Sequence, residues 1–413
     1  MNIENSSIVM PKHIYLDNAA TTPVDSAVLK EMMPYFMKKF GNPFSAHSFG
    51  QEAKVAIDNA REQVANFLGA SSEEVFFTSG ATESNNWTVF GVLKSVKTSA
   101  AAEKPGSIFV PHIITSAFEH HCVLNSSLAS EKAGAKLSLI KPKADGVIDA
   151  QDIAKEITDQ TILISIMYVN NEVGTIQPIK EIGEIIKNAK ADRLAKGNKM
   201  PLYFHTDAVQ AANYLKCDVD YLGVDLLTLS AHKIYGPKGA GSLYVRRGTR
   251  IAPSQYGGEQ ESNLRAGTHN VPGIVGMGKA VSLIEKHKKG LPKMKKLRDK
   301  LFAEIMKISG TQINGSREFR APNNANFSFR GIEGESLIIS LDMAGIAAST
   351  GSACSSASLA PSHVLTSMGI SPEVAHASLR LTLGKDATEQ EINYVIKELP
   401  PIIERLRKIS GRR

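Results

Sequence analysis

The spacing of apolar residues predicts an alternation of strands and helices over most of the chain. Short continuous apolar runs are typical of buried strands, whereas apolar residues three or four positions apart indicate one face of a helix. The predicted strands span residues 13–17, 74–78, 112–115, 135–140, 162–169, 202–205 and 226–229. The predicted helices span residues 24–40, with an interruption at Pro34, 51–68, 122–132, 153–157 and 179–196, and a further helix opens after residue 79. Gly69 closes the helix at 51–68.

This alternation predicts an α/β fold with a mostly parallel sheet, in which ligands gather where the strands end. After Pro272 the pattern changes to helices over residues 274–287, 294–308 and 389–408 with a few short strands, which predicts a second, smaller α+β domain. Residues 94–106 are polar and rich in Ala and Lys, and we interpret them as a surface insertion.

The composition restricts the class of protein. The chain has 413 residues, a net charge of +7 and three cysteines. The basic residues cluster in 286–300 and near the C-terminus without interleaved aromatic residues, which favours solvated helix faces over a nucleic-acid site. The cysteines are too few and scattered for a disulfide framework or a zinc site. Because we find no signal pattern and no membrane-length apolar run, we expect a cytoplasmic protein without a membrane partner.

A lysine follows the predicted strand at 226–229, in the stretch LSAHKIYGPKGAG that begins at Leu229. An isolated lysine is usually a solvated surface residue, and for Lys233 alone this is the default interpretation. The functional alternative is a Schiff base between its amine and a carbonyl compound, above all pyridoxal 5'-phosphate (PLP). The choice depends on what the other strand ends carry.

Other strand ends offer groups that suit such a cofactor. Residues 79–82 lie between a strand and a helix, so the backbone N–H groups around Ala81 and the hydroxyl of Thr82 are candidates for a phosphate site. Ser230 and His232, just before the lysine, offer further donors. Asp207 closes another strand, where it either caps the next helix or pairs with a pyridinium nitrogen.

Three more polar positions point to the same site. His120 follows the strand at 112–115, and is either a satisfied structural residue or a ring that stacks on a cofactor and moves protons. Asn171 follows the strand at 162–169 and offers an amide to a substrate. Arg380 alternates with apolar residues in SLRLTL, a pattern that calls for an anion such as a carboxylate beside it.

Cys354 lies in the stretch STGSACSSAS, which is rich in Gly, Ser and Ala. Most lone cysteines are buried and inert. Because this one lacks bulky apolar neighbours, we interpret it as an exposed thiol that acts as a nucleophile if its pKa is lowered locally.

With these residues in hand, the chain resembles the cysteine desulfurases, in the class V aminotransferase group of fold-type I PLP enzymes. The resemblance covers nearly the whole chain. It rests on the ordered segments YLDNAATTPVD, GNPFSAH, FTSGATESNN, EHH, VNNEVGTIQP, HTDAVQ, SAHKIYGPKGAG, GGEQESNLRAGTHN, GSACSSASLAPSHVL and LRLTLG. It implies a large PLP-binding domain over residues 22–288 with a mostly parallel seven-stranded sheet, and a small α+β domain formed by residues 1–21 and 289–413.

The resemblance also implies the roles of individual residues. Lys233 forms the Schiff base with PLP and moves protons at the substrate Cα, Asp207 pairs with the pyridine nitrogen, and Cys354 takes the sulfur of L-cysteine as a persulfide, releasing alanine. His120 stacks on the ring as an acid/base group. The remaining roles are a contact to the ring hydroxyl by Gln210, phosphate binding by Thr82, Ser230, His232 and, from the neighbouring subunit, Thr268, and binding of the substrate carboxylate by Asn171 and Arg380.

As partners the resemblance implies a second copy of the chain, in a homodimer, and a sulfur-acceptor protein such as an iron–sulfur scaffold or a tRNA-thiolation protein. The long small-residue segment around Cys354 is similar to the NifS/IscS-type branch. The sequence ends at Arg413, soon after its last helix, which favours a NifS-like member without the docking tail of IscS-like proteins.

Other functions remain open at this stage. A transaminase or epimerase on the same scaffold has no need for the thiol of Cys354. A selenocysteine lyase would use the same residues. A sulfur-relay or scaffold-binding subunit with vestigial catalysis would have no need for the complete set of Lys233, Asp207, His120 and Cys354.

Overall fold

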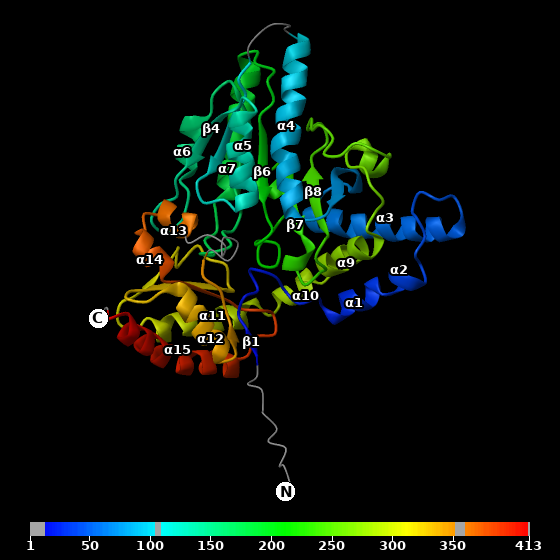
Figure 1. Ribbon diagram of the computed structural model, residues 1–413. Helices are drawn as coiled ribbons and strands as arrows, with labels where there is room; N and C mark the ends of the chain where they lie inside the picture. Colours follow the sequence, from blue (N-terminus) through cyan, green and yellow to red (C-terminus); the bar gives the residue numbers. More distant parts are fainter. Residues whose placement is uncertain (1–12, 104–108, 352–359, 412–413) are drawn as a thin grey trace.

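A seven-stranded sheet forms the centre of the large domain in the computed structural model, which describes residues 13–103, 109–351 and 360–411 (Figure 1). The strand order is β2-β8-β7-β6-β5-β3-β4. The strands are β2 (Val75–Thr78), β3 (His112–Ser116), β4 (Lys136–Ile140), β5 (Thr161–Ser165), β6 (Tyr203–Asp207), β7 (Leu226–Ser230) and β8 (Gly241–Val245). Only β8 runs against its neighbours, so the predicted mostly parallel sheet is confirmed.

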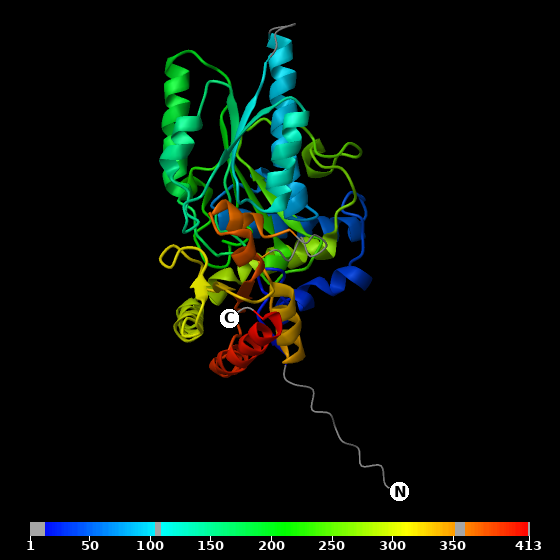
Figure 2. The same cartoon turned by 60° about the vertical axis from the view of Figure 1, so that its left-hand side comes forward.

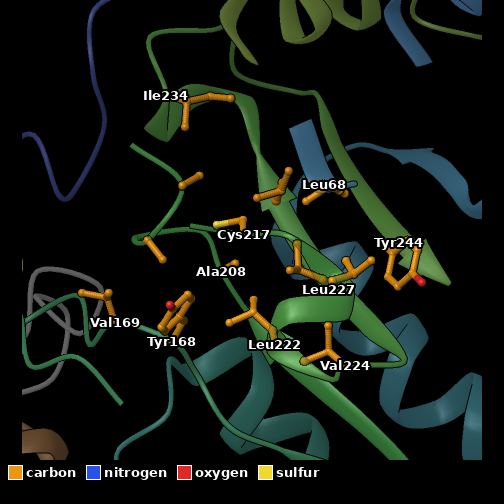
Figure 3. Close-up of a cluster of buried hydrophobic side chains, with 14 of the residues drawn as sticks. Leu68, Tyr168, Val169, Ala208, Cys217, Leu222, Val224, Leu227, Ile234 and Tyr244 are labelled. Atoms are coloured by element: carbon orange, nitrogen blue, oxygen red, sulfur yellow. The ribbon is translucent and has the colours of Figure 1, made fainter. Parts of the chain in front are cut away.

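Helices cover both faces of this sheet, because successive strand residues point to opposite sides. Leu226 packs with side chains of α4 (Ala81–Glu103), whereas Leu227 packs with those on the other face. Figure 3 shows part of that second core, with Leu227, Leu222 and Tyr244 close together. The helices with residues in this core include α1 (Ser26–Met32), α3 (Ser48–Leu68), α6 (Ala150–Glu156), α7 (Ile179–Ala195), α8 (Val219–Leu222), α9 (Val271–Ser282) and α10 (Ile284–Lys288).

The small domain packs its helices on a three-stranded antiparallel sheet of order β12-β10-β9. Its elements are β9 (Thr311–Ile313), β10 (Asn324–Phe329), β12 (Ser378–Thr382), α11 (Leu291–Ile305), α12 (Gly334–Met343), α15 (Glu389–Ser410) and the parallel pair β1 (Ile14–Tyr15) and β11 (Ile346–Ala347). They share a separate hydrophobic core, and Figures 1 and 2 both show them below the main sheet. The predicted α+β character is confirmed. We keep the boundaries at residues 21/22 and 288/289 as a proposal.

Short helices complete the structure, namely α2 (Pro34–Met37), α5 (His121–Lys132), α13 (His363–Ser367) and α14 (Pro372–His376). The last two lie late in the sequence, yet Val364, Leu365 and Ala375 pack into the large-domain core. This part of the C-terminal region therefore bridges the two domains.

Two expectations differ from the structure. The first part of the stretch interpreted as a surface insertion, residues 94–103, continues α4 as a helix, and Val96 is buried against the sheet. The predicted strand 162–169 is shorter, since β5 ends at Ser165. Ile166 and Tyr168, which follow β5, still donate backbone hydrogen bonds to β6. This continued pairing is consistent with the strand-like apolar pattern of residues 162–169.

Candidate active site

A cavity of about 620 Å³ lies where the parallel strands of the main sheet end. The sequence-predicted residues that line it are Ala81, Thr82, His120, Asn171, Asp207, Gln210, Ser230, His232, Lys233 and Arg380. They come from five strand ends of the large domain or the loops after them, and from β12 of the small domain. The structure therefore brings ten of the twelve predicted residues into one site.

The strand ends converge because of the strand register. Gly241, at the start of β8, pairs with both Thr78 at the end of β2 and Ser230 at the end of β7. A Cβ atom at Gly241 would lie 2.6 Å from the Cα of Gly80, so glycine is needed for this close approach. The start of α4 is thereby held beside the turn that carries Lys233.

Lys233 is the last residue of a single 3₁₀ turn, Ala231–Lys233, that follows β7. The turn directs its amine into the cavity, where Nζ donates hydrogen bonds to the carbonyls of Ala19 (2.5 Å) and Ala20 (2.7 Å). Gln210 donates to the same carbonyl of Ala19 at 2.9 Å. The lysine is thus a cavity residue rather than a solvated surface lysine.

Asp207 is a buried carboxylate at the end of β6. Burial raises its pKa, although hydrogen bonds from the Val209 N–H (3.0 Å) and the Asn85 amide (2.7 Å) and the charge of Lys233 oppose the rise. A turn follows it rather than a helix, so the alternative role as a helix cap is wrong. A protonated ring nitrogen beside this carboxylate would stabilise its charged form.

His120 carries its proton on the nitrogen that faces away from α5. Its Nδ1 accepts the backbone N–H of Cys122 at 3.2 Å and lies 2.9 Å from the Cys122 sulfur. Because Nδ1 is an acceptor, the neutral ring is protonated at Nε2. Burial, and then the charge of Lys233, lower the pKa of His120 to about 4. At neutral pH the ring is therefore uncharged and able to donate from Nε2.

The N-terminus of α4 forms the anion-binding end of the cavity. Ala81 and Thr82 belong to its first turn, where backbone N–H groups have no partner within the helix. His232 lines the same cavity, with Nδ1 3.1 Å from the hydroxyl of Thr21. Burial lowers the pKa of His232 to about 4, so without a bound anion its ring is neutral at neutral pH. A phosphate dianion bound beside the ring would favour the protonated form.

Arg380 forms the substrate side of the cavity. It reaches from β12 to Asp17, with which it forms an ion pair at 2.7 Å, and to the carbonyl of Asn171 at 3.1 Å. Its Nε and the side-chain oxygen of Asn171 are buried and have no hydrogen-bond partner among the described residues. A small anionic ligand such as an amino-acid carboxylate would satisfy the free guanidinium N–H.

The two remaining predicted residues are Cys354 and Thr268. Cys354 lies outside the described residues. Thr268 is exposed and does not line the cavity of its own chain. Its loop is anchored by Glu261, which binds Arg61 and His269.

Sequence reasoning missed several residues of the site, above all Asn85, Glu172 and Asp17. All three lie inside the segments quoted above, but their contacts cannot be read from those segments. Asp17 pairs with a residue 363 positions away, and no local pattern contains that information.

Comparison with known proteins agrees with this geometry. The family model described as "Aminotransferase class-V" matches residues 14–395. A protein named "Cysteine desulfurase IscS" from Dictyoglomus turgidum is 48% identical over 403 residues, covering 97% of each chain. The chain belongs to the cysteine desulfurases of the aminotransferase class-V family.

Solved structures support the same assignment. A "NIFS-LIKE PROTEIN" matches 95% of this chain and 100% of its own with a TM-score of 0.84 and 38% identity. The structure "SspA in complex with cysteine" matches 90% and 98% with a TM-score of 0.75 and 36% identity. The fold is that of fold-type I PLP enzymes, and PLP is the cofactor of this family. The lysine amine, buried carboxylate and helix N-terminus described above fit that cofactor.

None of the helices in the described ranges has the length and apolar character needed to cross a membrane.

Proposed function

We propose that the protein converts L-cysteine to L-alanine with PLP and transfers the sulfur to Cys354 as a persulfide. The observation that carries this proposal is the presence of Lys233, Asp207, His120 and Arg380 around one cavity, in a chain of this family. The sulfur then passes to an acceptor protein in iron–sulfur cluster or thio-tRNA synthesis. We place this activity in the cytoplasm.

Each predicted residue of the cavity has a proposed task. Lys233 holds the cofactor through its amine and then moves a proton at the substrate Cα. Asp207 keeps the ring nitrogen protonated, Gln210 contacts the ring hydroxyl, and His120 stacks on the ring as an acid/base group. The phosphate is held by Ala81, Thr82, Ser230, His232 and, from a second copy, Thr268. When bound, PLP supplies an electron sink for the carbon atoms of the substrate.

Asn171 and Arg380 orient the substrate by its carboxylate. The Arg380 Nε–H is buried and unsatisfied by the described residues, and its fork suits a planar carboxylate. Fixing that end of the amino acid sets the direction of its side chain, which is the part that reacts.

Transfer of the substrate sulfur to Cys354 requires no external oxidant or reductant. The Cys354 sulfur forms a bond to the substrate sulfur while the bond from that sulfur to Cβ breaks. The carbon keeps the electron pair and gains a proton, so that L-cysteine and one thiol give L-alanine and one persulfide. The small residues around Cys354 in the sequence suit a thiol that serves first the substrate and then an acceptor.

The proposed partner in the assembly is a second copy of the chain. Large apolar side chains are exposed along α1, α2 and the loop after them, including Phe36, Met37 and Phe40. Phe44, in the same region, stacks on His269, the residue after Thr268. One apolar surface therefore continues into the loop that would reach the neighbouring site. Sedimentation of the purified protein as a dimer is the expected result, and a monomer would contradict it.

The activity is tested by measuring alanine and sulfide released from L-cysteine in the presence of a reductant. Wild type should release both in equal amounts, the Cys354→Ala variant should keep the cofactor colour but form no persulfide, and Lys233→Ala should lose the covalently held cofactor. Sulfide release by Cys354→Ala at the wild-type rate would show that the nucleophile is wrong. A PLP-loaded wild type that left cysteine unchanged would favour a selenocysteine lyase or another reaction of this family.

A further inference from the structure

Asn85 and Cys122 contact residues of the cavity and have no task in the reaction as proposed above. Asn85 belongs to α4 and is fully buried, whereas Cys122 is the second residue of α5 and lines the cavity. The side-chain amide of Asn85 donates one hydrogen bond to Oδ2 of Asp207 at 2.7 Å and another to the sulfur of Cys122 at 3.1 Å. A single amide nitrogen therefore joins the carboxylate at the end of β6 to the start of α5.

The thiol of Cys122 continues these contacts to His120. Burial, followed by the negative charge of Asp207, raises the pKa of Cys122 to about 12, so the thiol keeps its proton. Its sulfur lies 2.9 Å from Nδ1 of His120, which carries no proton because it accepts the backbone N–H of Cys122. The S–H group therefore donates to Nδ1 while the sulfur accepts from Asn85. The hydrogen bonds thus run from Asp207 through Asn85 and Cys122 to His120.

A purely structural role explains these two side chains poorly. Oδ1 of Asn85 is buried and has no hydrogen-bond partner among the described residues, a cost in free energy that an apolar side chain would avoid. Cysteine is a weaker helix former than alanine, and its sulfur is only a weak acceptor for the amide. What the pair supplies, and what alanine at either position would not, is a connection between Asp207 and His120.

We propose that Asn85 and Cys122 are positioning residues that link the carboxylate of Asp207 to the ring of His120. This inference rests on the proposed function, which gives these two groups their tasks at the cofactor ring. The thiol adds to the backbone N–H in holding the imidazole in the tautomer with its proton on Nε2, and it fixes the plane of the ring. The amide in turn fixes the direction of the thiol. Because hydrogen bonds in a chain polarise one another, each contact should strengthen the next.

The first test observes the link directly and needs no turnover. The protein carries isotope-labelled histidine and is loaded with PLP, and the nitrogen NMR signal of His120 Nδ1 is identified by its loss in His120→Gln. In Cys122→Ala this signal should move towards that of an acceptor nitrogen with a weaker hydrogen bond. In Cys122→Ser it should stay closer to wild type, since a hydroxyl also donates.

The matched control for this measurement is Cys217→Ala. Cys217 is also a buried cysteine, and burial likewise raises its pKa to about 12. Its side chain packs in the hydrophobic core of the large domain, with the sulfur 4.0 Å from the carbonyl of Leu215. The same substitution at this position should therefore leave the Nδ1 signal of His120 unchanged.

The second test is a double-mutant cycle on the release of alanine from L-cysteine. Asn85→Ala and Cys122→Ala should each lower kcat about fivefold, the factor that one neutral hydrogen bond contributes, while the KM for L-cysteine changes less than about twofold. The double variant should lose little more than the stronger single variant, because either change breaks the same link. Cys217→Ala should leave kcat unchanged.

The inference is overturned if the Nδ1 signal of His120 is the same in Cys122→Ala and in wild type, or if the two losses in kcat multiply in the double variant. Should Asn85→Ala fail to fold, the Cys122 variants decide, because an equal loss of kcat in Cys122→Ala and Cys122→Ser would also contradict the proposal. A wild type that released no alanine from L-cysteine would refute the proposed function, and the NMR measurement would then decide on the link alone.

Discussion

Replacing Glu261 by glutamine should weaken the fold around the loop that carries Thr268. Glu261 is buried, and its two oxygens accept hydrogen bonds from both terminal nitrogens of Arg61 at 2.6 and 2.7 Å. The ring of His269 and the backbone N–H of Phe77 add bonds of 2.6 and 2.8 Å. One carboxylate thus fixes the loop to α3 and to β2.

The magnitude follows from the pKa of this carboxylate. Burial alone would raise it, but the hydrogen bonds from Arg61 and His269, the charge of Arg61 and the N–H of Phe77 lower it from 4.5 to about 2. Each pKa unit corresponds to about 1.4 kcal/mol, so the ionised form contributes about 3 kcal/mol to stability. Because the folded-state pKa is lowered, this contribution is complete above about pH 4.5 and is lost as the pH falls towards about 2.

The assay is urea unfolding at equal protein concentration, followed by the fluorescence of Trp87, which is the only tryptophan and is buried on α4. At about pH 7 we expect Glu261→Gln to lower the free energy of unfolding by about 3 kcal/mol, and at about pH 3 by much less. The control is Glu73→Gln, which removes an exposed ion pair with Arg247 and should change stability little.

Two results would refute this reasoning. The first is a loss below about 1 kcal/mol at neutral pH, which would mean that the carboxylate is replaceable. The second is a difference between wild type and variant that grows in acid, because this has the wrong sign for a lowered pKa.

Two further predictions concern the cavity. Arg380→Lys should raise the KM for L-cysteine about tenfold or more with a smaller change in kcat. The reason is that lysine cannot bridge Asp17, Asn171 and a carboxylate as the arginine fork does. Steady-state kinetics measure both constants, and an unchanged KM would exclude the carboxylate role. Because the pKa of His120 is about 4, its ring stays neutral as the pH rises from about 5 to 8. The dependence of kcat/KM on pH in this range should therefore have the same shape in wild type and in His120→Gln.

Much of the site was predictable because its chemistry lies at strand ends. Lys233, Asp207 and His120 each follow an apolar run, and parallel strands bring their ends to one edge. Local sequence was sufficient to place these residues at or after strand ends, but not to choose between their structural and functional interpretations. The family resemblance then supplied their roles, which no hydrophobic pattern contains.

The rest depends on contacts between distant parts of the chain. Arg61 and Glu261 are 200 positions apart, and three consecutive residues from Glu261 adopt a positive φ although none is glycine. Neither fact has a local signature in the sequence. The continuation of α4 beyond Lys94 was hidden for a different reason, because residues 94–99 are mostly polar and Val96 is the one buried side chain among them.

The substrate side of the cavity exists only where the two domains meet. Arg380 belongs to the small-domain sheet, yet the carbonyl of Asn171 in the large domain holds one of its terminal nitrogens. Glu172, the next residue, is held in turn by two amides of β10. A shift of one domain against the other would therefore disturb the contacts of Arg380 and Glu172 together.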